Sequence, residues 1–389
     1  MRRFIMTRTA YRVAAFFLLI AIIIGITANF THAAEFTAEV AAKSAVLMEA
    51  STGRILFAYN ENEALPPASV TKIMTLLLVM EAVDNGTIKM TDMVQASEHA
   101  ASMGGSQIYL KVGEEMSVEE LIKSVVVSSA NDAAVALAEY VAGSEEAFVA
   151  LMNKRAGELG MVNTSFENTN GLDDDTKNHL TSALDIAIMS RELLKHETIL
   201  NYTGIWMDTI RDGAFGLTNT NRLIKFYSGA NGLKTGSTSK AGFCISATAL
   251  RDGLQLIAVI MGSPTRDIRN EEAKKLLDFG FANYSHTEIE GSTLTPLPVY
   301  GGYDTECPIV YESFEAVVEK GKTEKIETVI DLPESLAAPI QKGDVVGKIT
   351  YMLDGEALGS VDITASVDVP KITYYELLIR IIKEFLVIG

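Results

Sequence analysis

The chain has 389 residues, of which 48% are hydrophobic and 21% are charged, with 29 glycines and 9 prolines. This is the composition of an ordinary globular protein with room for about two or three domains. The formal net charge of −17 argues against a nucleic-acid-binding protein, because such proteins present a basic surface.

The N-terminus has the pattern of a secretory signal peptide. Four arginines precede an apolar run from Val13 to Ile26, and small residues follow near Ala33. This order of a basic region, a short apolar region and small residues predicts a signal peptide over residues 1–33, cleaved after Ala33 or Ala34. The apolar run is short for a transmembrane helix, although an uncleaved anchor is the alternative. We therefore expect an exported protein.

The next elements in chain order alternate between strands and helices. Residues 44–60 predict a hairpin around Ser51-Thr52-Gly53. Helical patterns run from Ser69 to about Leu194, and Ser117 with Glu120 forms a capping box at one helix start. From Ala230 the pattern returns to three strands and then a helix over residues 267–284. Strands at both ends of a helical middle predict an α/β sandwich whose sheet unites both sets of strands.

The pattern changes near residue 290. From Ser292 to Lys371, short alternating segments are separated by Gly and Pro turns, which is typical of a small all-β domain. We therefore expect a larger domain over residues 34–290, a small all-β domain over 291–371 and a terminal segment over 372–389.

The terminal segment predicts an amphipathic helix. Its polar residues fall within one narrow sector of a helical projection, and apolar residues cover the remainder. Such a wide apolar face, with tyrosines at headgroup depth, suits a helix lying in a membrane interface. The alternative is a helix that docks on its own domain or self-associates.

Ser69 and Lys72 stand three residues apart where a helix begins, and so lie on one helix face. A serine becomes a nucleophile when a neighbouring base takes its proton, and a buried lysine can be that base. The Ser-x-x-Lys pattern alone is weak, because a chain of this length contains about one or two by chance. A second match, Ser237 to Lys240, is present. The alternative is a capping serine beside a solvated lysine.

Two further motifs follow in order: Ser129-Ala130-Asn131 between helical runs, and Lys234-Thr235-Gly236 on a strand edge. Ser-x-x-Lys, Ser-x-Asn and Lys-Thr-Gly in this order resemble the signature of penicillin-binding proteins and serine β-lactamases.

This resemblance implies a role for each residue. Ser69 would attack a carbonyl to form an acyl-enzyme, with Lys72 as general base. Ser129 would pass a proton to the leaving nitrogen, and Asn131 would orient Lys72 and the substrate amide. Lys234, which also helps to keep Lys72 neutral, would hold the substrate carboxylate with Thr235. Gly236 would leave room for substrate along the strand edge, and the backbone N–H groups of Ser69 and Ser237 would form the oxyanion hole.

Within that group the chain resembles the low-molecular-mass penicillin-binding proteins, the serine-type D-alanyl-D-alanine carboxypeptidases. The resemblance rests on "PPASVTKIMT", on "ANGLKTGSTSKAGFC" and on the segment from Asn163 to Leu193, which contains His179, Thr181, Ser182, Ala183 and Asp185. It implies a penicillin-binding or β-lactamase-like transpeptidase domain of α/β class, followed by the family's β domain and membrane anchor.

The family resemblance also implies the reaction and its place. The enzyme would remove the terminal D-alanine from peptidoglycan stem peptides that end in D-Ala-D-Ala, without a metal or other cofactor. β-Lactam antibiotics would inhibit it covalently. The protein would act at the outer face of the cytoplasmic membrane, in the cell wall or periplasm, held by residues 372–389.

The chain departs from the family pattern at two positions. Some members have His after Lys-Thr-Gly, where this chain has Ser237; the oxyanion donor is backbone, so we expect little loss. Some members place an Arg at the position of Thr220 to bind the terminal carboxylate. Here Arg222 lies two residues later, and whether it takes that role stays open.

Two other functions fit parts of the pattern. A secreted β-lactamase would need a glutamate to activate water, and Glu167 lies in the expected region. A non-catalytic penicillin-binding module would recognise wall peptides without turnover, but complete motifs argue against it. The two cysteines, Cys244 and Cys307, fall in different predicted domains. We expect them to be free, with a bridge as the alternative that an exported compartment would permit.

Overall fold

The computed structural model describes residue 36, residues 39–173 and residues 176–387. The predicted signal peptide over residues 1–33 lies outside the described residues. The first described strands are β1 (Ser44–Glu49) and β2 (Ile55–Tyr59), which pair antiparallel as the predicted hairpin. Every residue of β1 is buried, whereas β2 is largely exposed, so only the first strand of this hairpin belongs to the interior of the domain.

A five-stranded antiparallel sheet organises the larger domain, in the order β2-β1-β9-β8-β7. Its other strands are β7 (Ala230–Thr238), β8 (Gly242–Arg251) and β9 (Leu254–Ser263). Since β1 pairs with β9 along its whole length, the strands from both ends of the domain join one sheet, which confirms the α/β prediction. The ladder leaves β7 at an edge.

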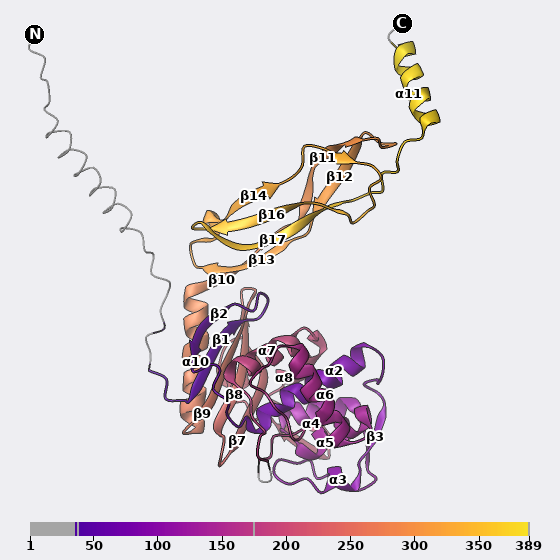
Figure 1. The fold of residues 1–389 in the computed structure, drawn as a ribbon. Helices are drawn as coiled ribbons and strands as arrows, with labels where there is room; N and C mark the ends of the chain where they lie inside the picture. The colour runs from indigo at the N-terminus through magenta and orange to yellow at the C-terminus, as the bar shows by residue number, and fades with distance from the viewer. Residues whose placement is uncertain (1–35, 37–38, 174–175, 388–389) are drawn as a thin grey trace, which may run out of the picture. The chain divides into compact units, whose positions relative to one another are not determined.

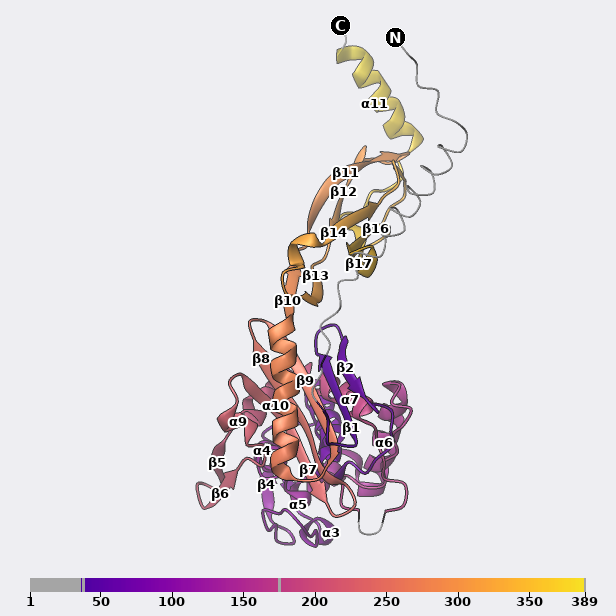
Figure 2. The same cartoon turned by 90° about the vertical axis from the view of Figure 1, so that its left-hand side faces the viewer.

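Helices cover both faces of this sheet (Figures 1 and 2). The helix α10 (Arg266–Asn283) packs on β9 and β8, and α7 (Ala183–Leu194) packs on β1 and β9 from the helical side. The remaining elements of the helical middle are η1 (Ala68–Thr71), α2 (Lys72–Asp84), α3 (Glu98–Ala101), α4 (Val118–Val127), α5 (Asn131–Ala142), α6 (Glu145–Glu158), η2 (Glu197–Ile199), α8 (Leu200–Thr203) and α9 (Leu223–Phe226). The N-cap half of the predicted capping box is confirmed, because Ser117 Oγ accepts the Glu120 N–H at 3.2 Å.

Two small two-stranded sheets flank the helices, and only the second is a hairpin. One pairs β3 (Met93–Gln95) with β4 (Glu115–Ser117), and the other pairs β5 (Met207–Ile210) with β6 (Phe215–Thr218). This hairpin was not predicted, although the Asp212-Gly213 turn between its strands is a hairpin signal.

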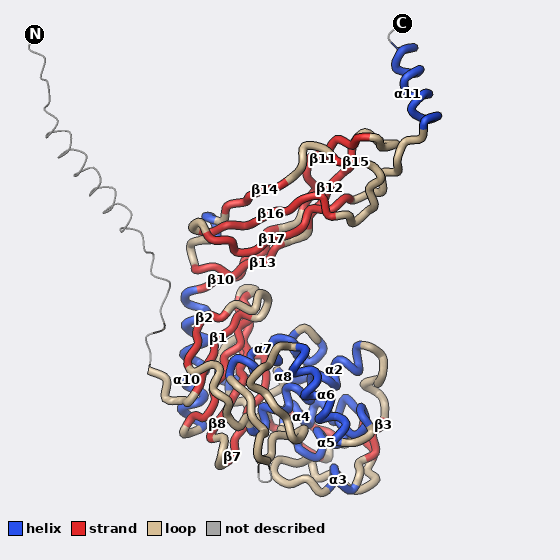
Figure 3. Tube along the Cα trace, viewed as in Figure 1, coloured by secondary structure: helices blue, strands red, loops and turns tan. Residues whose placement is uncertain are grey.

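The following segment is built almost wholly of strands (Figure 3). The strand β10 (Tyr284–Ile289) pairs with β13 (Phe314–Glu319), so this pairing begins before the boundary predicted at residue 291. A six-stranded sheet has the order β14-β16-β17-β12-β11-β15. Its strands are β11 (Ser292–Tyr300), β12 (Glu306–Tyr311), β14 (Glu327–Asp331), β15 (Leu336–Ala337), β16 (Val345–Leu353) and β17 (Glu356–Ala365). They enclose a separate hydrophobic core.

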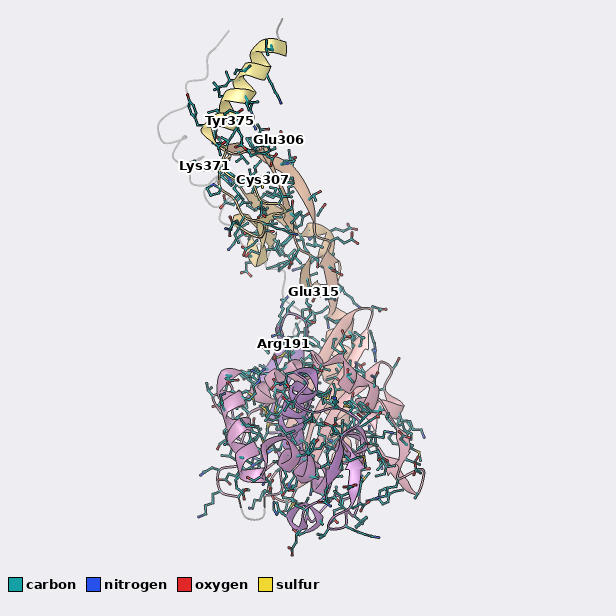
Figure 4. All side chains as sticks on the ribbon, turned by 90° about the vertical axis from the view of Figure 1, so that its right-hand side faces the viewer. Arg191, Glu306, Cys307, Glu315, Lys371 and Tyr375 are labelled. Atoms are coloured by element: carbon teal, nitrogen blue, oxygen red, sulfur yellow. The ribbon has the colours of Figure 1, made fainter. Side chains whose placement is uncertain are left out.

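Cys244 lies in β8, and Cys307 (labelled in Figure 4) lies in β12. Both thiols are buried and free, so the prediction that they are unpaired is confirmed. Burial raises the pKa of the Cys244 thiol to about 11, which keeps it in the unreactive protonated form.

The terminal helix α11 (Tyr374–Val387) starts at a capping box, in which Thr373 N–H donates to Glu376 Oε2 at 2.8 Å. Tyr375, at the start of this helix in Figure 4, is 71% exposed. Apolar side chains farther along, such as Leu378 and Ile382, are also exposed. Among the described residues, no helix is both long enough and apolar enough to cross a membrane.

Candidate active site

Ser69 is the second residue of η1, which passes directly into α2 at Lys72. The backbone of Ala68 adopts φ +50°, a left-handed conformation that is rare for a residue with a side chain. The helix-cap residues here are Pro67 and Thr71, so Ser69 is not the capping serine of the alternative interpretation. Its hydroxyl is instead a partner of Lys72.

Lys72 is fully buried at the first position of α2. Its Nζ lies 2.9 Å from Ser69 Oγ, 2.6 Å from Asn131 Oδ1 and 2.8 Å from the carbonyl oxygen of Asn170. Burial, with a smaller contribution from the positive charge of Lys234, holds the pKa of Lys72 well below its usual value. The solvated lysine of the alternative interpretation is therefore excluded.

The contacts of Lys72 define what its neutral amine can do. A neutral amine has two hydrogens and one lone pair, and two of its three neighbours are carbonyl oxygens that can only accept. Asn131 Oδ1 and Asn170 O take the two hydrogens. The lone pair is then left for the proton of Ser69, whose Oγ is the third neighbour.

The second motif lies at the junction of α4 and α5. Ser129 has φ +63°, and Asn131 is the first residue of α5. The Asn131 side chain is held from both ends, because its Nδ2 donates to the Gly104 carbonyl at 2.7 Å while its Oδ1 accepts from Lys72. The amide orientation is thereby fixed toward Lys72.

The third motif lies on the edge strand β7. Lys234 is buried, and its Nζ donates to Ser129 Oγ and to the Thr235 carbonyl, each at 2.8 Å. Burial, and then the charge of Arg269, lowers the pKa of Lys234 to about 7. Thr235 Oγ1 donates to Thr220 Oγ1 at 2.8 Å. The second and third motifs are therefore in direct contact.

Gly236 is required by close packing of protein backbone. A Cβ at this position would lie 2.8 Å from Ser69 N, 2.9 Å from Pro67 O and 2.9 Å from Val70 N. Real Cβ atoms essentially never approach other atoms so closely. The sequence predicts that this glycine leaves room for substrate. In addition, it allows β7 to lie directly against the turn that carries Ser69.

A cavity of about 660 Å³ opens at this junction. It is lined by Ser69, Ser106, Ser129, Trp206, Thr218, Asn219, Thr220, Arg222, Phe226, Thr235, Gly236, Ser237, Arg266 and Arg269. Six of these are predicted site residues, including Arg222. Lys72 and Lys234 are not among the described lining residues; they lie buried behind Ser69 and Ser129.

Several lining residues were missed by the sequence interpretation. Arg266 and Arg269 start α10, and the charge of Arg269 acts on Lys234. Arg269 is buried, and its Nη1 donates to the Cys244 carbonyl at 3.2 Å. Nothing local in the sequence distinguishes these arginines from solvated first-turn residues. Trp206 lies beside β5, whose hairpin signal could have drawn attention to it.

The loop that precedes α7 also borders the site. Both Glu167 carboxylate oxygens accept backbone N–H groups, from Lys177 at 2.9 Å and Asn178 at 3.1 Å. Glu167 is not among the described residues that line the cavity. Lys240, of the second Ser-x-x-Lys match, donates to the Asp173 carbonyl. Both residues are thus engaged in holding the loop.

Comparison with known proteins gives consistent matches over most of the chain. A family model described as D-alanyl-D-alanine carboxypeptidase matches residues 29–265, and one described as penicillin-binding protein 5, C-terminal domain, matches residues 289–371. The D-alanyl-D-alanine carboxypeptidase DacF of Bacillus subtilis is 45% identical over 351 residues, which cover 88% of this chain and 90% of that protein.

Solved structures match in the same way. Penicillin-binding protein 5 from Haemophilus influenzae has a TM-score of 0.77 and 33% identity, covering 87% of this chain and 100% of that chain. Penicillin-binding protein D2 from Listeria monocytogenes, solved in its ampicillin-bound form, has a TM-score of 0.58 and 31% identity, covering 63% of this chain and 100% of that chain.

Proposed function

Because the chain belongs to the D-alanyl-D-alanine carboxypeptidase family, a family of serine-type peptidases, we propose that Ser69 is its nucleophile and Lys72 its general base. The observation that carries this assignment is the buried Lys72 amine, whose two carbonyl acceptors leave its lone pair for Ser69. The substrate is a peptidoglycan stem peptide ending in D-Ala-D-Ala.

Acylation proceeds through linked proton transfers between Ser69, Lys72 and Ser129. Lys72 takes the Ser69 proton as Oγ attacks the carbonyl carbon of the penultimate D-alanine. The developing oxyanion accepts hydrogen bonds from the backbone N–H groups of Ser69 and Ser237. Ser129, which Lys234 orients, gives its proton to the leaving nitrogen and takes in its place the proton that Lys72 received from Ser69. The C–N bond breaks, free D-alanine departs, and water later hydrolyses the ester to restore Ser69.

The terminal carboxylate is bound at the cationic end of the cavity. Thr235 faces it from β7, with Lys234 buried behind Ser129, and Arg269 and Arg266 line the same cavity from α10. Arg222, the residue predicted as an alternative donor, lines the cavity as well. Carboxylate binding by guanidinium groups is strong because the pairing is bidentate.

The alternative of a β-lactamase is disfavoured by the contacts of Glu167. Its two carboxylate oxygens are occupied by backbone N–H groups of its own loop, so it is poorly available to activate water. The acyl-enzyme formed with a β-lactam is then long-lived, and the antibiotic acts as a covalent inhibitor.

The test is an intact-mass time course of residues 34–389 mixed with excess benzylpenicillin. A single lasting adduct, absent from Ser69→Ala, is the expected result. Rapid hydrolysis of the drug with only transient labelling would instead indicate a β-lactamase. Release of D-alanine from a D-Ala-D-Ala peptide at the wild-type rate by Ser69→Ala would refute the nucleophile assignment.

We further propose that the protein is exported and that residues 372–389 bind the membrane surface. The exposed apolar side chains of α11, such as Leu378 and Ile382 one turn apart, form a face that a water-soluble surface rarely presents. In this proposal residues 1–33 are removed, residues 34–290 carry catalysis, and residues 291–371 connect the enzyme to its anchor.

Co-sedimentation with vesicles of phosphatidylglycerol and phosphatidylethanolamine tests the anchor. Deletion of residues 372–389, or the double change Leu378→Asp and Ile382→Asp, should leave the protein in the supernatant. Lys383→Gln, at an exposed position of the same helix, is the matched control and should still sediment. Sedimentation of the deletion variant at the full-length level would contradict the proposal.

A further inference from the structure

The turn that carries Ser69 is held by a chain of hydrogen bonds from a residue 108 positions away. His179 Nε2 lies 2.7 Å from Thr71 Oγ1, and Thr71 Oγ1 donates to the Ala68 carbonyl at 2.9 Å. His179 and Thr71 are both buried. This series, His179–Thr71–Ala68, is here called the relay.

The direction of each bond in the relay is determined. The Glu167 N–H donates to His179 Nδ1 at 3.0 Å, so Nδ1 is the unprotonated nitrogen of a neutral ring and Nε2 carries the hydrogen. Thr71 Oγ1 accepts that hydrogen and gives its own to Ala68 O. Burial agrees with a neutral ring, because it lowers the pKa of His179 to about 4.

The Ala68 carbonyl, which is the last acceptor of the relay, belongs to the same peptide unit as the Ser69 N–H. The Ala68 carbonyl and the Ser69 N–H are the two ends of one planar trans peptide, so they point in opposite directions. Fixing the carbonyl therefore fixes the direction of the N–H. Ala68 needs such fixing, because φ +50° is strained for alanine.

The surroundings leave the Ala68 carbonyl little other freedom. A Cβ at Gly171 would lie 1.9 Å from Ala68 O and 2.8 Å from Thr71 Oγ1, so the loop backbone closes directly over this group. Asn170, the preceding residue, accepts from Lys72 through its carbonyl. The same loop thus borders both the base and the relay.

We infer that His179 and Thr71 are positioning residues that aim the Ser69 N–H into the oxyanion hole. The inference rests on the proposed role of Ser69. The inference gives neutral His179 a part in acylation although its ring is not among the described residues that line the cavity. The ring orients the Thr71 hydroxyl, and this hydroxyl orients the peptide between Ala68 and Ser69. No proton is transferred along the relay during the reaction.

The test compares two buried threonines one turn apart, Thr71 at the end of η1 and Thr75 in α2. Thr71→Val removes the hydroxyl of the relay. Thr75→Val is the matched control, because Thr75 Oγ1 donates to the Thr169 carbonyl of the same loop at 2.6 Å but does not contact the Ser69 peptide. Thr71→Ser restores a hydroxyl. His179→Ala, alone and combined with Thr71→Val, completes a double-mutant cycle.

The readouts separate transition-state stabilisation from binding and folding. Loss of an oxyanion donor costs about 10²–10³-fold in rate, so misdirection of the Ser69 N–H by Thr71→Val should slow acylation by a fluorescent penicillin about 10- to 100-fold. The affinity for a peptide boronic acid, whose serine adduct is tetrahedral, should fall in parallel. Initial non-covalent binding of the penicillin should change less than about twofold.

The outcomes decide the inference. The relay is supported if Thr75→Val and Thr71→Ser are acylated at near-wild-type rates. It also requires that adding Thr71→Val to His179→Ala slows acylation little further. Equal rates for Thr71→Val and Thr75→Val, or fully additive losses in the cycle, would overturn it while leaving the proposed function intact. Failure of the wild-type chain to be labelled at all would overturn the proposed function and the relay with it.

Discussion

The packing of Gly236 against the Ser69 turn yields a sharp prediction for Gly236→Ala. The added Cβ would meet three backbone atoms at 2.8–2.9 Å, and none of them can rotate away as a side chain could. Ordinary contact begins near 3.4 Å, so β7 and the turn must separate by about 0.6 Å. Overpacking of this kind costs about 1–3 kcal/mol of folding stability.

The catalytic loss should exceed the loss of stability. The two proposed oxyanion donors, Ser69 N and Ser237 N, lie on the two segments that are pushed apart. Misplacement by about 1 Å can cost about 10²-fold in rate, and we expect acylation by a fluorescent penicillin to slow by roughly this factor.

The control is Gly216→Ala, at a strand glycine of β6 that has open space around its missing Cβ. It should leave both the acylation rate and the unfolding midpoint unchanged or slightly improve stability. Denaturant unfolding and acylation kinetics are measured on both variants. An acylation rate for Gly236→Ala within twofold of wild type would refute the packing argument.

Three other changes probe the charges around the nucleophile. The pKa of Lys234 is lowered to about 7, so its positive charge is lost as pH rises through 7. The value of kcat/KM for a D-Ala-D-Ala peptide should therefore decline above that pH. The variant Lys234→Arg stays charged and should remove the decline. Asn131→Asp places a carboxylate beside Lys72 Nζ and so raises the pKa of Lys72; activity should drop at neutral pH and recover at alkaline pH, whereas an unshifted pH profile would contradict the role of Lys72 as base. Glu167→Gln should leave the lifetime of the penicillin adduct unchanged, and a clearly longer lifetime, measured by intact mass, would favour the β-lactamase alternative.

Much of the fold could be predicted because its signals are local. The hairpin at residues 44–60, the three strands from Ala230 and the helix after them follow from residue periodicity and turn residues. The all-β segment shows the same regular punctuation. The β5–β6 hairpin was missed because its two strands are only four residues long and lie between the helical stretch that ends near Leu194 and the strands that begin at Ala230.

The residues of the candidate site also divide into those that local sequence motifs reveal and those whose place depends on tertiary packing. Ser69, Lys72, Ser129 and Lys234 stand in short motifs, so they could be found from the sequence. Arg269 could not, because its place beside Lys234 depends on α10 packing against the sheet. Likewise, no local pattern pairs Thr71 with His179, since the contact exists only after the loop before α7 has folded over α2.

The pairing of β1 with β9 has a consequence for how the chain acquires its structure. Residues 44–49 are among the first described residues to leave the ribosome, yet their ladder partner, residues 254–263, is made about 200 residues later. The sheet therefore cannot close during most of synthesis, and contacts between such distant segments form slowly. A delay of this kind keeps the catalytic unit open while the chain is made, which suits the proposed export of this protein across a membrane.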